Sequence, residues 1–166
     1  MTDFVDTNVL VYALDEEQGE RHVTARALIE DLWEAERGVL STQVLQELYV
    51  TLTRKLRKPM TRPRARAVVE RYAAWPTHQI TPDDIVAASE LEQRHSLAFW
   101  DALIVVAAQR LNATRVVSED MQADRAFGGI RIFNPFATGA ARPHQPSGRP
   151  DGRVDPVASH DRRARM

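Results

Sequence analysis

Four acidic residues of this chain lie at or beside apolar segments. They are Asp6 in FVDTNVLVYAL, Glu47 in STQVLQELYV, Asp101 in FWDALIVVAA and Asp120 in VVSED. Water solvates carboxylates strongly, so a carboxylate among apolar neighbours is costly unless a positive group neutralises it. Carboxylate oxygens are the ligands that Mg²⁺ and Mn²⁺ prefer. The four residues therefore indicate a site for a divalent cation.

Such a site has a definite chemistry. Carboxylates that lie close together repel one another, so without a cation some of them take up protons. A divalent metal removes this conflict, lowers the pKa of a bound water and polarises a phosphoryl oxygen, so that a phosphodiester can be hydrolysed without histidine, serine or lysine. We expect Asp6 and Asp101 to be the strongest ligands, followed by Glu47 and then by Asp120, directly or through water.

Each acid also has a simpler explanation. Asp6 and Asp101 could be helix N-caps or first-turn acids, Asp120 could cap a short helix over 121–127, and Glu47 could be an exposed helical residue. For any one of these residues alone, the simpler explanation is favoured. Together the simpler explanations are not favoured, because all four acids occur in order and beside sharply apolar neighbours.

Two short polar side chains accompany the acids. Asn8 stands two residues after Asp6, and Ser118 stands two residues before Asp120. We expect both to orient the carboxylates or the scissile phosphate. A phosphatase of the haloacid dehalogenase type is disfavoured, because it would need an aspartate at position 8.

Strands and helices are expected to alternate along residues 1–136. The expected strands are short apolar or β-branched runs at 4–5, 39–40, 79–80, 115–117 and 130–133. The expected helices have a helical apolar period or a capping signal and cover 9–14, 22–37, 42–55, 62–75, 82–95 and 99–111. This order predicts an α/β fold, a short central parallel sheet flanked by helices. Ligands of such sheets bind beyond the carboxyl ends of the strands, where we expect the four acids to meet.

The composition fits one globular domain. The chain of 166 residues is 43% hydrophobic and has no cysteine, which excludes disulfides, thiolate metal sites and a cysteine nucleophile. Its five histidines have no metal-binding spacing, and no glycine-rich phosphate loop is present. There is no basic signal-peptide start, and the longest apolar run, 102–108, is too short to cross a bilayer. We expect a cytoplasmic protein without membrane contact.

Charge divides the chain into two parts. Residues 1–136 carry 16 Lys and Arg against 20 Asp and Glu, whereas residues 137–166 carry 6 Arg against 3 Asp. The second part is rich in Pro, Gly and Ser, and burial of its few apolar groups could not offset the entropy of ordering it. We predict a domain over 1–136 and a disordered, solubilising tail over 137–166. Contact of the tail arginines with RNA is the alternative.

One segment holds seven basic residues with no acid between them. They are Arg54, Lys55, Arg57, Lys58, Arg62, Arg64 and Arg66. A cationic hairpin beside an acidic metal pocket would hold a phosphate backbone while the metal acts on one linkage. We therefore expect RNA contacts, first of all from Arg54, Lys55, Arg57 and Lys58. An ordinary solvated surface is the alternative.

These motifs together resemble a known family. DTN at 6–8, the glutamate of QVLQEL at 43–48, FWDALI at 99–104, SED at 118–120 and NPF at 134–136 resemble, in that order, PIN-domain ribonucleases, and specifically the VapC toxins of type II toxin–antitoxin pairs. The resemblance covers 1–136. In the most similar subgroup SED is commonly followed by MQHG, but here Ala123 and Asp124 follow Met121 and Gln122. The role of Asp124 is therefore left open.

The resemblance implies a PIN-like domain and an Mg²⁺- or Mn²⁺-dependent endoribonuclease acting on tRNA, rRNA or mRNA. It assigns catalysis and metal binding to Asp6, Glu47, Asp101 and Asp120. It also implies a homodimer and a VapB-like antitoxin whose C-terminal segment enters the catalytic groove. Two alternatives stay open: a PIN-type RNA-processing nuclease without an antitoxin, and a non-catalytic RNA-binding module. The intact set of four acids speaks against the module.

Overall fold

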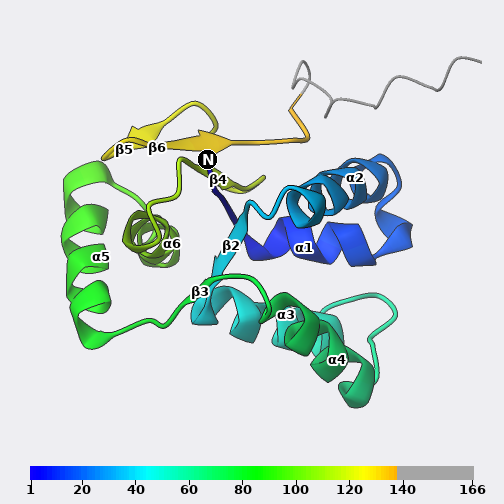
Figure 1. The fold of residues 1–166 in the computed structure, drawn as a ribbon. Helices are drawn as coiled ribbons and strands as arrows, with labels where there is room; N and C mark the ends of the chain where they lie inside the picture. The colour runs from blue at the N-terminus through cyan, green and yellow to red at the C-terminus, as the bar shows by residue number, and fades with distance from the viewer. Residues whose placement is uncertain (138–166) are drawn as a thin grey trace, which may run out of the picture.

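The computed structural model describes residues 1–137, which form one sheet with helices packed around it (Figure 1). The strands are β1 (Asp3–Val5), β2 (Gly38–Ser41), β3 (Thr77–His78), β4 (Arg115–Val117), β5 (Ala126–Phe127) and β6 (Ile130–Phe133). The helices are α1 (Thr7–Leu14), α2 (Glu20–Glu34), α3 (Thr42–Arg54), α4 (Arg62–Tyr72), α5 (Pro82–His95) and α6 (Phe99–Arg110), with a 3₁₀ turn η1 (Glu16–Gln18). The predicted tail, apart from residue 137, lies outside the described residues.

The sheet has the strand order β3-β2-β1-β4-β6-β5 and is parallel except at one edge. Phe4 of β1 lies opposite Val39 of β2 and Val116 of β4, and all of these neighbours are parallel. Parallel strands in the middle of a sheet are covered on both faces, so Phe4 and Val5 are fully buried. The predicted α/β fold with a short, mostly parallel sheet is confirmed.

β5 is the exception, because it pairs antiparallel with β6. Gly128 and Gly129 join the two strands with φ angles of 55° and 88°. Two consecutive positive φ angles suit the tight hairpin turns that match the twist of a sheet, and glycine adopts them without strain. The strand over 126–127 was not predicted, and the short helix over 121–127 considered as a simpler role for Asp120 is wrong.

Other differences concern the ends of elements. The predicted strand over 79–80 is wrong, because the pairing with Leu40 and Ser41 is made by Thr77 and His78. The helix predicted to reach residue 37 ends at Glu34, because Glu36 has a left-handed φ of 52° and the Arg37 amide turns back to the Leu32 carbonyl. This closure satisfies carbonyls that the last helical turn leaves free.

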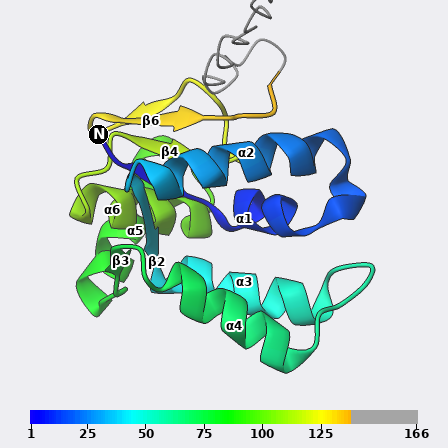
Figure 2. The same ribbon diagram turned by 45° about the vertical axis from the view of Figure 1, so that its right-hand side comes forward.

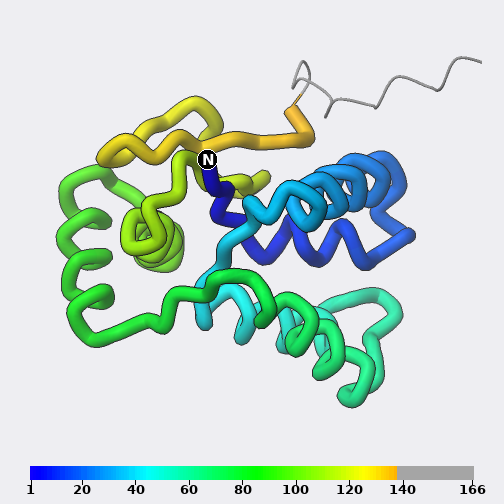
Figure 3. The backbone as a smooth tube through the Cα atoms, in the orientation of Figure 1, coloured from blue at the N-terminus to red at the C-terminus, as the bar shows by residue number. Residues whose placement is uncertain are grey.

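The helices pack as pairs: α1 with α2, α3 with α4, and α5 with α6 (Figures 1 and 2). α1 also packs beside α3. In the tube of Figure 3, the dark blue start of the chain lies beside a much later segment, because β1 and β4 pair in the middle of the sheet. This arrangement brings the start of α1, the body of α3, the start of α6 and the segment after β4 to one pocket.

Two buried carboxylates are structural anchors. Asp3 of β1 is fully buried and receives ion pairs from Arg37 and from Arg115, whose Nε lies 2.7 Å from Asp3 Oδ1. Asp84 in the first turn of α5 is 1% exposed. Burial by itself would raise the pKa of Asp84, but hydrogen bonds from the Thr81 backbone, His78 and Arg110 outweigh it and hold that pKa well below its usual range.

A membrane-crossing segment was not expected from the sequence. Within residues 1–137, no helix combines the length and the apolar character that crossing a bilayer requires.

Candidate active site

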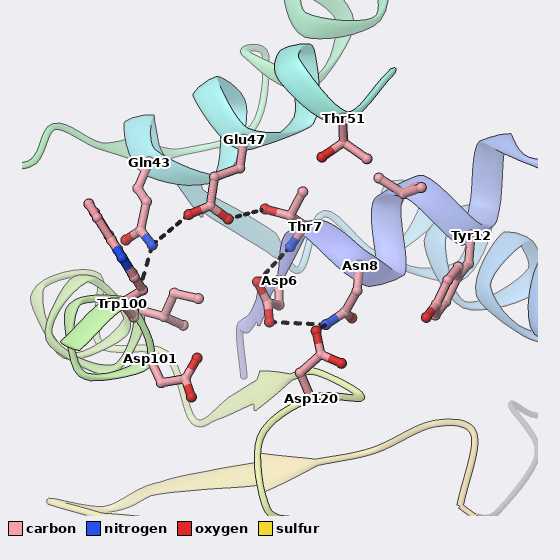
Figure 4. A pocket seen from close by; sticks show the side chains of 12 residues that line it. Asp6, Thr7, Asn8, Tyr12, Gln43, Glu47, Thr51, Trp100, Asp101 and Asp120 are labelled. Carbon is pink, nitrogen blue, oxygen red and sulfur yellow. Dashed lines mark hydrogen bonds between the residues drawn. The ribbon is translucent and has the colours of Figure 1, made fainter. Parts of the chain in front are cut away.

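The four acids predicted from the sequence line one pocket of about 320 Å³ (Figure 4). Asp6 follows β1 and caps the N-terminus of α1, Glu47 lies in the middle of α3, and Asp101 lies in the first turn of α6. Asp120 follows β4, with Ser118 and Glu119 between them. The acids thus come from four separate segments of the chain.

Asp6 is the most buried of the four, with 6% of its surface exposed. The Thr7 amide donates a hydrogen bond of 2.7 Å to its Oδ1, and the Ser118 hydroxyl donates one of 2.7 Å to its Oδ2. Burial raises the pKa of Asp6 to about 6, and the negative charges of Glu47 and Asp101 add to this, despite the two hydrogen bonds. An ionised Asp6 therefore needs a positive partner.

Asn8 and Ser118 both form hydrogen bonds with the acids. The Asn8 amide nitrogen donates to Asp6 Oδ2 at 3.2 Å and to Asp120 Oδ2 at 2.9 Å, and so it bridges two of the acids. The Asn8 amide oxygen accepts a hydrogen bond from the Glu119 backbone at 3.3 Å. Ser118 is fully buried behind Asp6. Asn8 therefore ties α1 to the segment after β4.

Glu47 is held by two residues that sequence reasoning missed. The Thr7 hydroxyl donates to Glu47 Oε2 at 3.1 Å, and the Gln43 amide donates to Glu47 Oε1 at 3.0 Å. Gln43 stands four residues before Glu47 on α3, a spacing that places two side chains on the same helix face and that could have signalled the contact. With both hydrogen bonds made, the Glu47 side chain still lines the pocket.

Asp101 is held less firmly than Asp6 and Glu47. Burial raises the pKa of Asp101, and the charges of Asp120 and Glu47 raise it further. Within the described part of the chain no hydrogen bond offsets these effects. The carboxylate is therefore free to turn toward a ligand in the pocket.

Tyr12 is a further lining residue that sequence reasoning missed. Its hydroxyl donates a hydrogen bond of 2.5 Å to Glu119, and the other Glu119 oxygen lies 2.7 Å from Arg21 Nε. Burial and the bond to Glu119 raise the pKa of Tyr12 to about 12, so the hydroxyl keeps its proton at neutral pH. The Tyr12–Glu119 contact joins residues 107 positions apart, which no local pattern shows.

The donor set of the pocket fits a hydrated divalent cation. Among residues 1–137, no three His, Asp or Glu side chains form a ready-made cage for a metal ion. Mg²⁺ does not need such a cage, because it keeps several waters and takes only one or two carboxylates directly. The pocket offers only oxygen ligands from its four acids, and burial disfavours the charged form of Asp6. These are the conditions under which a hard cation stabilises a site.

The basic residues lie apart from the acids. Arg54 and Arg62 line a second cavity of about 390 Å³ between α3 and α4, and the Lys58 ammonium lies 3.0 Å from Glu17. Arg54 follows Glu47 by seven residues, so it lies two turns, or about 10 Å, further along α3. Asp124 is exposed in the segment before β5, outside the acidic pocket.

A comparison with known protein families identifies the class of protein that has this fold and pocket. Residues 4–127 match the model of the PIN domain. The chain belongs to the PIN domain family. Within that family it is similar to Ribonuclease VapC23 of Mycobacterium tuberculosis, with 31% identity over 128 residues. The aligned region covers 75% of this chain and 97% of the relative. The resemblance seen in the sequence motifs is confirmed.

Solved structures of toxin–antitoxin proteins share the fold, and two of them illustrate the likeness. A toxin–antitoxin complex from Klebsiella pneumoniae has a TM-score of 0.59 at 18% identity and covers 82% of this chain and 100% of that chain. VapC20 of Mycobacterium tuberculosis, a toxin that cleaves the sarcin–ricin loop, has a TM-score of 0.54 at 22% identity and covers 69% of this chain and 87% of that chain.

Proposed function

We propose that the protein is a metal-dependent endoribonuclease, and that it is the toxin of a VapBC-type toxin–antitoxin pair. One observation carries the nuclease proposal: four carboxylates from separate segments line one pocket, and the pKa of the most buried one is raised to about 6. Membership of the PIN family and similarity to a VapC ribonuclease support the same reaction. The reaction is hydrolysis of phosphodiester bonds in tRNA, rRNA or mRNA.

In this proposal Asp6 and Asp101 hold Mg²⁺ or Mn²⁺, assisted by Glu47 and Asp120 directly or through water. When bound, the metal lowers the pKa of a water and polarises a phosphoryl oxygen. The chain itself orients the carboxylates through several hydrogen-bond donors. Thr7 and Gln43 fix the two oxygens of Glu47, and Ser118 fixes Asp6 Oδ2.

Asn8 couples the two ends of the site. Its amide nitrogen holds Asp6 and Asp120 at a fixed separation, so both carboxylates face the same space. Asp101, which no donor among residues 1–137 holds, can adjust to the bound ion. We assign a positioning role to Asn8 and Ser118, and metal binding and catalysis to Asp6, Glu47, Asp101 and Asp120.

The proposed partners are RNA, a VapB-like antitoxin and a second copy of the chain. Arg54 lies on the same helix as Glu47, and Lys55, Arg57 and Lys58 continue the basic segment, so we assign phosphate contacts to them. The toxin–antitoxin complex among the structural neighbours supports the antitoxin. Growth arrest on expression alone, relieved by a co-purifying small protein, would separate a toxin from an RNA-processing nuclease. A cytoplasmic location belongs to the same proposal.

The first test is cleavage of a mixed tRNA and rRNA pool with Mg²⁺ or Mn²⁺, beside EDTA and the Asp101→Asn variant. We expect discrete fragments that disappear with EDTA. Asp101→Asn should lower the rate by more than about 100-fold, because changes even outside the ligand shell cost about 10- to 100-fold.

The matched control is Asp83→Asn, which makes the same chemical change in the first turn of α5, outside the pocket. This variant should cleave as fast as the natural protein. Fragments that persist in EDTA, or in Asp101→Asn, would contradict a metal nuclease at this site.

A further inference from the structure

Trp100 is a lining residue of the acidic pocket that the proposed chemistry does not use. It lies in the first turn of α6, directly before Asp101, and it is 61% exposed. Its backbone carbonyl accepts a hydrogen bond of 3.4 Å from Gln43, which also holds Glu47. Figure 4 places the indole at the edge of the pocket, beside Gln43. A large aromatic ring therefore lies exposed next to the acids.

The exposure of Trp100 differs from that of the other tryptophans. Trp75 is 5% exposed, and Trp33 packs against Trp75 and Tyr72 with ring centroids 4.9 Å and 6.0 Å apart. The ring of Trp100 meets only the edge of Phe99, at 5.3 Å, among the aromatic contacts of residues 1–137. Folding thus leaves this one indole available for a ligand of the pocket.

Tyr12, the other aromatic residue of the pocket, is already engaged. The Arg21 guanidinium lies 5.8 Å from the centre of its ring, and Phe136 meets it edge-on at 5.3 Å. Its hydroxyl is bound to Glu119. Tyr12 is therefore a fixed wall of the pocket, whereas Trp100 has a free ring.

We propose that Trp100 stacks on a nucleobase of the RNA substrate, next to the phosphodiester bond that the acids act on. This inference rests on the proposed ribonuclease function and adds a residue that binds the base. The indole and the Asp101 carboxylate branch from adjacent residues of one helical turn, so both groups lie at the same part of the pocket. A nucleotide has the matching arrangement, an anionic phosphate joined through its sugar to a base with flat aromatic faces.

Charge favours a nucleotide over a second copy of the chain at this place. A second copy that met this rim about a twofold axis would bring its own four carboxylates toward the four that line the pocket. A phosphate would be attracted by the cation that these acids would hold, and its base could then contact Trp100 at the rim. Stacking needs a base with an open face, so Trp100 would favour unpaired nucleotides and tolerate different bases.

The test combines a protein change with an RNA change. The substrate is a short single-stranded RNA carrying a bond mapped in the RNA pool, with an abasic nucleotide placed on either side of that bond in turn. At one of these positions, the abasic RNA should raise the KM of the natural protein about 5- to 150-fold, the range that loss of one stacked base gives. Trp100→Ala should raise the KM for the intact RNA by a similar factor.

The decisive readout is the combination of the two changes. Trp100→Ala should cleave the abasic and the intact RNA with the same KM, because both changes remove one contact. Trp100→Phe should recover most of the affinity for the intact RNA. The control is Val86→Ala, which shortens an exposed apolar residue on α5, away from the pocket. It should leave the KM for the intact RNA and the KM for the abasic RNA unchanged.

Two results would overturn the stacking role while leaving the nuclease function in place. One is an unchanged KM in Trp100→Ala. The other is an abasic penalty that is as large in Trp100→Ala as in the natural protein. Loss of a dimer or of antitoxin binding in Trp100→Ala, with KM unchanged, would assign the indole to a protein partner instead. Absence of cleavage by the natural protein would contradict the proposed function itself.

Discussion

The Asp6 carboxyl group is buried, yet it accepts hydrogen bonds from Thr7 and Ser118 that favour its charged form. Burial prevails and raises its pKa from 3.8 to about 6. The folded chain therefore binds this proton more tightly than the unfolded chain does. The stabilisation that the proton gives is complete below about pH 4 and is lost as the pH rises through about 6.

Replacement of Asp6 by Asn should therefore stabilise the metal-free protein at neutral pH. The amide keeps the shape of the side chain and removes the buried charge, which costs on the order of 3 kcal/mol, since one pKa unit is about 1.4 kcal/mol. We expect a Tm several degrees higher for Asp6→Asn in EDTA at pH 7.5, and no gain at pH 4. Mg²⁺ should raise the Tm of the natural protein and not that of Asp6→Asn.

The control for this measurement is again Asp83→Asn, the same chemical change at an exposed first-turn aspartate outside the pocket, which should not raise the Tm. An equal gain of Asp6→Asn at both pH values would mean that the buried charge is not its cause.

At the scale of elements, the segment after β4 depends on contacts with the first two helices. Glu119 accepts hydrogen bonds from Tyr12 of α1 and Arg21 of α2, while Asn8 of α1 holds Asp120. The segment 118–120 has no regular secondary structure of its own. Its geometry, and therefore the position of Asp120, follows from these side-chain contacts.

Arg21→Ala should consequently slow cleavage, by about 10-fold if it resembles the loss of an outer-shell contact. The Tm should hardly change, because the arginine side chain is 53% exposed and exposed ion pairs contribute little to stability. A lysine at position 21 can still meet Glu119 and should recover most of the rate. The measurement is kcat against Mg²⁺ concentration, which should show weaker metal use in Arg21→Ala.

Arg26→Ala is the matched control, because Arg26 pairs with Glu30 on the outer surface of the same helix. It should leave both kcat and the Mg²⁺ dependence unchanged. If Arg21→Ala and Arg26→Ala behave alike, the Glu119 contacts do not position Asp120.

Elements with strong local signals could be predicted from the sequence, and elements defined by their partners could not. α5 begins at Pro82 as expected, because Thr81 and Asp84 form a capping box that is visible in the sequence. β3 and β5 have two residues each, so pairing with β2 and β6 defines them rather than any periodicity. At the pocket, the acids could be singled out beside their apolar neighbours, whereas the partners that hold Glu119 become visible only in the fold.

At the scale of the whole molecule, the pocket exists because the sheet brings distant segments together. The lining runs from Asp6 to Asp120, and every lining residue belongs to α1, α3, α6 or a segment that follows a strand. The large, fully buried side chains, among them Phe4, Leu40, Leu48 and Phe127, come from the same residues 1–137.

Removal of residues 138–166 should leave the PIN domain intact, because the matched family model ends at residue 127 and the pocket lining ends at Asp120. We expect the shortened chain to keep its Tm and its kcat on a short RNA. The informative quantity is the dependence of KM on salt, because each phosphate contact made by the tail would add about 0.7 to the slope of log affinity against log salt on single strands.

A solubilising tail predicts equal slopes for the full and the shortened chain, and a lower solubility for the shortened one. Tail contact with RNA predicts a shallower slope after removal. A full-length variant with the six tail arginines changed to glutamine separates charge from length. If the natural chain has a steeper slope than both the shortened chain and this variant, the arginines bind RNA, and a purely solubilising role is wrong.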